Sequence, residues 1–170
     1  MIKALCLLGA DVSVRAHNGW LPIHSAANSG HIDATEELLR RNTPFMIADY
    51  DGYTPLHLAA ISGSVAVLSM LLNKGHAISP RANDGRVPLH CAALHGNVDA
   101  IKLFLEKGVD VSTLADDGEM PLHCAAGGPI STHLYLNVKF GGDFATARGE
   151  KNLYGLEVST DPVRAIRTTH

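Results

Sequence analysis

The chain has 170 residues, of which 46% are hydrophobic and 18% are charged, a balance typical of a water-soluble globular protein with a buried core. The 14 basic and 17 acidic residues give a formal net charge of -3, and no run of basic residues is longer than the pair Arg40 and Arg41. Charge therefore gives no support for electrostatic capture of nucleic acid or of an anionic membrane, and we expect neither as a partner.

The N-terminal apolar stretch and the cysteines bear on the compartment. Residues 4–10 are too few to span a membrane, and Asp11 follows them directly. The three cysteines, Cys6, Cys91 and Cys124, are odd in number and too few for a disulfide framework, which favours a reducing compartment. We expect a cytoplasmic protein, with the nucleus as the alternative, and no membrane insertion.

One period of 33 residues organises the chain. Asn18-Gly19, Asp51-Gly52, Asp84-Gly85 and Asp117-Gly118 recur at this spacing, each followed by a proline, an apolar residue, a histidine and then a pair of alanines. Four occurrences without an insertion are not expected by chance. The period predicts a repeat array over 1–126 and a non-repeat tail over 127–170. The array divides into a partial unit at 1–17, full units at 18–50, 51–83 and 84–116, and a partial unit at 117–126.

Each unit predicts a turn, a short helix, a second turn and a second helix. The Asx-Gly pair suits a tight turn, and the proline suits the first position of a helix, as over residues 55–62. Gly30, Gly63 and Gly96 are placed to end these first helices. The second helices begin near Ile32, Val65 and Val98 and repeat apolar residues at i, i+3, i+6 and i+7, which predicts one buried face. Only Thr35 interrupts this face, and we expect it to loosen its layer.

The segment from Asp51 to Ala60, with its recurrence every 33 residues, resembles the ankyrin-repeat family over residues 1–126. The resemblance implies an all-α solenoid of stacked antiparallel helix pairs with hairpin fingers along one edge. It also implies a structural role for the recurring histidines, which would bond to turn backbone and tie each unit to its neighbour: His24, His57, His90 and His123. Of the family's threonine before the proline only Thr54 is present. Leu21, Val87 and Met120 replace it, and each lost cap predicts a cost of about 0.5–2 kcal/mol.

Metal binding and catalysis find no support in the pattern. The motif histidines recur once per unit, roughly 10 Å apart at the usual helix-packing distance, too far to share an ion whose bonds are about 2 Å. The same spacing separates Cys91 from Cys124 by more than a disulfide allows. No nucleophile elbow, phosphate-binding loop or carboxylate pair has a suitable context. We expect no metal, no cofactor and no enzymatic activity.

The resemblance implies that partners bind to the finger tips and to the exposed face of the first helices, along a concave surface. The corresponding residues are His17, Trp20, Asn28, Ser29, Tyr50, Tyr53, Ile61, Ser62, Asn83, Arg86, Leu94, His95, Asp116 and Glu119. Trp20, Tyr50, Tyr53 and Arg86 form our candidate binding centre, because aromatic residues and arginine dominate interface hot spots. The alternative is that these aromatic side chains pack against the neighbouring finger.

The fourth finger is acidic. Asp110, Asp116, Asp117 and Glu119 gather there, which predicts either a partner with a basic flank beside an apolar anchor or a solvated acidic rim.

These observations predict a protein-protein interaction scaffold or adaptor, with no nucleic acid and no small molecule as ligand. The alternative is a targeting or regulatory segment of a larger enzyme or channel. In the tail, apolar and polar residues alternate over 133–140, which predicts one strand, and Asp161-Pro162 could start a short helix. We expect the tail to be either a disordered extension or a cap on the last helix of the array.

Overall fold

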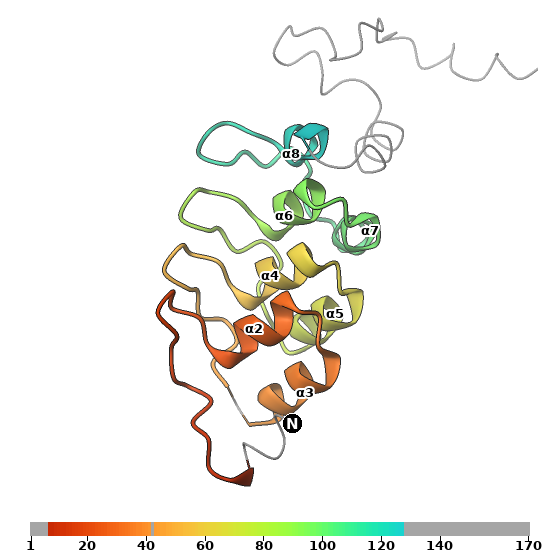
Figure 1. The fold of residues 1–170 in the computed structure, drawn as a ribbon. Helices are drawn as coiled ribbons and strands as arrows, with labels where there is room; N and C mark the ends of the chain where they lie inside the picture. Colours follow the sequence, from red (N-terminus) through yellow and green to blue (C-terminus); the bar gives the residue numbers. More distant parts are fainter. Residues whose placement is uncertain (1–6, 42, 128–170) are drawn as a thin grey trace, which may run out of the picture.

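The computed structural model describes residues 7–41 and 43–127. These residues form seven short helices in two rows, joined by loops (Figure 1). The first row contains α2 (Pro22–Asn28), α4 (Pro55–Ser62), α6 (Pro88–Leu94) and α8 (Pro121–Gly127). The second row contains α3 (Ile32–Arg40), α5 (Val65–Asn73) and α7 (Val98–Glu106). These residues contain no strand, which confirms the predicted all-α stack. The strand and helix predicted in the tail lie outside the described residues.

The first row packs closely because small side chains face one another. Each of its helices begins at the proline of its unit, and Ala27, Ala60 and Ala93 are fully buried between neighbouring helices. As predicted, glycines in the left-handed region follow the first three helices, at φ values of 65° to 74°. None of the helices within the two described ranges is long and apolar enough to cross a membrane.

The second row adds large core side chains to those of the first row, Ile23, Leu56 and Leu89. Leu38, Leu71 and Phe104 occupy equivalent positions of α3, α5 and α7 and are buried. Thr35 is also fully buried, and its hydroxyl donates to the carbonyl of His31 at 2.9 Å, so its polar atom is satisfied within the layer. Ile32 does not lie on the predicted buried face and is 43% exposed. It is the first residue of α3, and helical side chains tilt toward the N-terminus, so Ile32 projects beyond the helix end.

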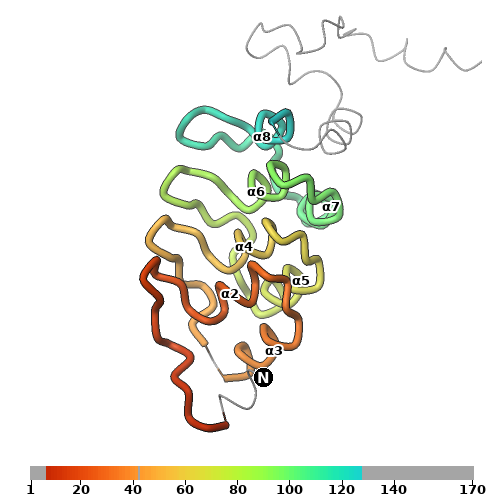
Figure 2. The backbone as a smooth tube through the Cα atoms, in the orientation of Figure 1, coloured from red at the N-terminus to blue at the C-terminus, as the bar shows by residue number. Residues whose placement is uncertain are grey.

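The loops before the first helices form hairpin fingers that project to one side of the helix rows (Figure 2). One backbone hydrogen bond joins each pair of neighbouring tips, for example from the N–H of Asn83 to the carbonyl of Asp51 at 3.0 Å. Gly52 lies between them at a φ of 85°, and a Cβ there would overlap the backbone nitrogen of Asn83. Glycine is required at this turn both for its backbone conformation and for the close approach of the next finger.

Candidate functional site

The four motif histidines act as caps of the first helices. In each unit the Nδ1 atom accepts a hydrogen bond from the backbone N–H of the residue before the proline. The distances are 3.0 Å at Leu21, 3.1 Å at Thr54, 3.2 Å at Val87 and 2.9 Å at Met120. Because this bond uses a backbone donor, it forms whichever residue precedes the proline. The units without threonine therefore keep part of the cap.

The other ring nitrogen ties neighbouring units together. The Nε2 atom of His57 lies 3.2 Å from the carbonyl oxygen of Arg86, and that of His90 lies 3.1 Å from the carbonyl oxygen of Glu119. Since Nδ1 accepts, Nε2 carries the proton and donates, which requires the neutral ring. Burial lowers the pKa of His57 to about 4 and also lowers the pKa values of His24 and His90. Within the described residues, Nε2 of His24 has no hydrogen-bond partner.

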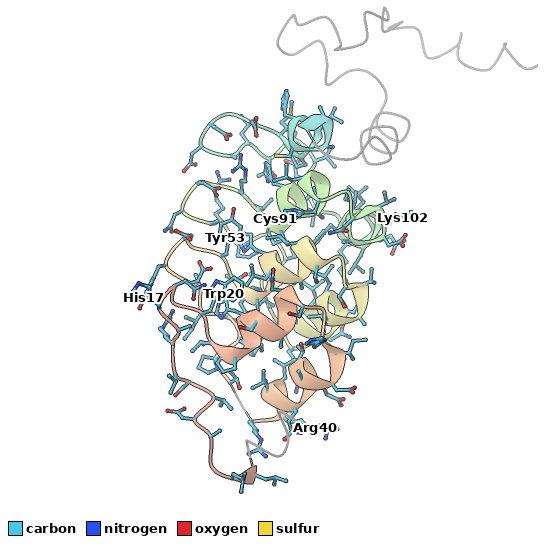
Figure 3. The ribbon with its side chains drawn as sticks, in the orientation of Figure 1. His17, Trp20, Arg40, Tyr53, Cys91 and Lys102 are labelled. Carbon is cyan, nitrogen blue, oxygen red and sulfur yellow. The ribbon has the colours of Figure 1, made fainter. Side chains whose placement is uncertain are left out.

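Two of the predicted binding aromatics reach sideways to the next finger. The indole Nε1 of Trp20 donates to Asp49 at 2.8 Å, and the hydroxyl of Tyr53 lies 3.4 Å from Asp84. Both rings are half-buried at the base of the fingers, whereas His17 lies at a tip (Figure 3). Burial raises the pKa of Tyr53 to about 12, so its hydroxyl stays a donor. These two side chains bond neighbouring fingers to one another.

Arg86, at the equivalent position of the third finger, bonds to three carboxylates. Its guanidinium lies 3.0 Å from Asp84, 3.0 Å from Asp117 and 3.2 Å from Glu119, and the last two belong to the fourth finger. The side chain is 27% exposed, and its Nε is buried without a hydrogen-bond partner in the described part of the chain. Arg86 thus fastens the last finger to the stack, and little of its charge is left for a partner.

The remaining predicted positions differ in exposure. Seven are exposed: His17, Ser29, Tyr50, Asn83, Leu94, His95 and Asp116. Asn28, Ile61, Ser62 and Glu119 are half-buried, as are Trp20, Tyr53 and Arg86. Tyr50 and Leu94 stand out because both are large and apolar, with exposed fractions of 65% and 42%. They lie on a finger tip and at the end of a first helix, which are the two kinds of position predicted to contact a partner.

Sequence reasoning missed several side chains that join units. Asn97 donates to the carbonyls of Ala60 and Ile61 at 2.8 Å each. Its equivalents in the other units are His31 and Ser64, so no periodic signal marked it. Arg15 and Arg81 each donate to a backbone carbonyl of the next finger, at 3.1 and 2.9 Å. Their spacing of two repeat periods was a usable signal for this role.

The two cysteines among the described residues are packing residues. Cys91 and Cys124 are free and buried, and burial raises the pKa of Cys91 to about 12 and that of Cys124 to about 11. Both therefore stay protonated thiols, which are poor nucleophiles and poor metal ligands. Across residues 7–41 and 43–127, no three His, Cys, Asp or Glu side chains cluster in a way that could hold a metal ion.

Comparison with protein-family models gives two matches. Residues 1–84 match a family described as ankyrin repeats (3 copies), and residues 89–128 match one described as ankyrin repeats (many copies). A search of the curated proteins found no match. The two matched segments together contain all seven described helices except Pro88, the first residue of α6.

Proposed function

This chain belongs to the ankyrin-repeat family, and on that premise we propose that it is a scaffold or adaptor that binds a partner protein. Ankyrin repeats are generally protein-protein interaction modules. The observation that carries the proposal is the exposure of Tyr50 and Leu94, at 65% and 42%, where the family places its contacts. Large apolar side chains left in water at such positions supply the anchors of an interface.

The binding centre of the proposal consists of Tyr50, Leu94 and the exposed polar residues around them. Trp20, Tyr53 and Arg86 serve as supports, since each already bonds to the next finger. Their contribution to binding comes through the position of the fingers. A partner that contacts several fingers needs the fingers held at fixed spacing, because ordering them on binding would cost affinity.

The proposal includes no chemistry of the chain's own, no cofactor and no metal. It places the protein in a reducing compartment, the cytoplasm or the nucleus, in keeping with thiols that are buried and unpaired at Cys91 and Cys124. A targeting or regulatory segment of a larger enzyme or channel would use the same surface, and no contact among the described residues favours it.

Affinity capture with matched variants tests this proposal. The chain offers a close control, because Ile32 at the start of α3 is 43% exposed and Leu94 at the end of α6 is 42% exposed. We expect Leu94→Ser combined with Tyr50→Ser to lose proteins that the parent chain retains from cytosolic extract, whereas Ile32→Ser keeps them. Helical circular dichroism must be the same for all three. If no protein is retained by the parent, or all chains retain the same proteins, the proposed surface is wrong.

A further inference from the structure

Charge is segregated between the parts of each repeat. The finger segments, residues 11–20, 44–54, 77–87 and 110–120, hold eight acidic and three basic residues, a balance of −5. The second helices with their flanking turns, residues 31–43, 64–76 and 97–109, hold five of each sign, a balance of zero. The first helices and the turns after them hold no charged residue. All of the net charge of residues 7–127 therefore lies on the fingers.

The three finger arginines are already counted in the balance of −5, and each is bonded within the stack. Arg86 pairs with three carboxylates, and Arg15 donates to the carbonyls of Gly19 and Ala48 at 2.7 and 3.1 Å. Arg81 donates to the carbonyl of Leu114 and lies 3.5 Å from Asp116.

Carboxylates on the finger tips stay open to a ligand. The side chain of Asp116 is 64% exposed despite its contact with Arg81. Asp51 is exposed at the tip of the second finger, and no cation within the described residues pairs with it. These groups face solvent along the same edge as Tyr50.

We propose that the partner of this face is a protein segment that combines Lys or Arg residues with an apolar anchor. The basic residues would lie against the acidic fingers, and the anchor would contact Tyr50 and the uncharged first helices at Leu94. An aromatic face attracts Lys and Arg cations. The guanidinium of Arg15 lies 5.9 Å from the centroid of the exposed Tyr50 ring, so a cation of the partner would approach the other face. An acidic segment would meet like charge and be rejected. This inference rests on the proposed function and specifies its partner.

Peptide display on the full-length chain tests the inference with a defined probe. A library of random peptides is selected on the protein, and the charge of the selected peptides is scored. The binding of one selected peptide is then measured by fluorescence anisotropy against two variants. The first combines Asp51→Asn with Asp116→Asn, and both changes copy residues that the chain itself has at the equivalent positions, Asn18 and Asn83. The second combines Glu36→Gln with Asp99→Asn, which removes the same charge from α3 and α7.

We expect the selected peptides to be rich in Lys and Arg. The finger variant should weaken binding by about twofold to thirtyfold, as the loss of two solvent-exposed charge pairs predicts, and added salt should weaken it further. The α3 and α7 variant should bind as the parent does. Peptides that bind without excess basic residues, or equal weakening by both variants, would overturn the inference and leave the proposed function standing. If no peptide is selected, both fail.

Discussion

The ring of His57 joins two units because each of its nitrogens has one fixed role. Nδ1 accepts from the N–H of Thr54, and Nε2 donates to the carbonyl of Arg86. A second proton on Nδ1 would make this atom a donor facing the N–H donor of Thr54. It would also place a positive charge in a fully buried position. The packing of the units is therefore coupled to the neutral state of the ring.

Stability should fall in mild acid for this reason. Burial lowers the pKa of His57 to about 4, below the 6.5 of a free histidine. The unfolded chain thus binds a proton first as the pH falls, so the contribution of this ring is complete above pH 6.5 and is lost between pH 6.5 and about 4. For one such group, the free energy of unfolding changes by at most about 1.4 kcal/mol per pH unit. Urea unfolding at pH 7.0, 6.0 and 5.0 measures it.

The variant His57→Gln provides the control for that experiment. It should be less stable than the parent at pH 7 and should lose less stability between pH 7 and 5, because one titrating group is gone. Acidic side chains have ordinary pKa values near about 4 and are the same in both proteins, so they do not account for a difference between the two profiles. Parallel pH profiles for parent and variant would show that His57 does not contribute.

The residue before the helical proline offers a reciprocal test of capping. The hydroxyl of Thr54 lies 3.0 Å from Nδ1 of His57, and Val87 occupies the same position one unit later, almost fully buried. We expect Thr54→Val to lower the free energy of unfolding by about 1 kcal/mol and Val87→Thr to raise it by about 0.5 kcal/mol. Equilibrium unfolding in urea measures both. A loss of stability in Val87→Thr would mean that burying the hydroxyl outweighs the cap.

At the scale of elements, the helices followed from the sequence and the finger contacts did not. The predicted helix over 55–62 matches α4, because proline, the alanine pair and the terminal glycine each act locally. The partners of Trp20, Tyr53 and Arg86 lie 29, 31 and up to 33 residues further on. The sequence separation between donor and acceptor thus differs from finger to finger and does not always equal the repeat period. A long finger side chain points sideways where the next finger has an acidic residue within reach, and outward where it does not. The motif of a single repeat does not specify the position of that acidic residue.

Arg86 makes more bonds to carboxylates of the fourth finger than Arg81, which also bonds to it. Replacing Arg86 with Gln removes bonds to Asp117 and Glu119, both more than 40% exposed, so water partly compensates the carboxylates. We expect a loss of about 1–2 kcal/mol in the free energy of unfolding, since three charge-assisted bonds are lost together. Hydrogen exchange should show faster exchange over residues 110–120.

The control is Arg40→Gln, which removes one exposed ion pair with Glu36 and should cost less than about 0.5 kcal/mol. Equal effects of the two changes, or no change of exchange in the fourth finger, would contradict the role assigned to Arg86.

At the scale of the whole molecule, every substantial contact between described helices joins elements of one unit or of adjacent units. Among the described helices of the stack in Figure 1, no substantial contact between distant units would hold it together if one layer failed. Its stability is then a sum over units and the interfaces between neighbours, and about three units are needed for a stable fold. The position of a defect along the stack should therefore determine how much of the chain unfolds.

Leu38 and Leu71 allow this to be tested with one substitution at two equivalent places. Both are buried leucines one period apart, in α3 of the first full unit and in α5 between α3 and α7. Either change to Ala should cost about 2–5 kcal/mol through lost packing and a cavity. Leu38→Ala should accelerate hydrogen exchange mainly over residues 20–41, because the units beyond it still form a stack. Leu71→Ala should accelerate exchange throughout residues 20–127, since it leaves too few intact neighbours on either side. Equal acceleration in α7 by both variants would mean that the array unfolds as one unit and that nearest-neighbour contacts alone do not describe it.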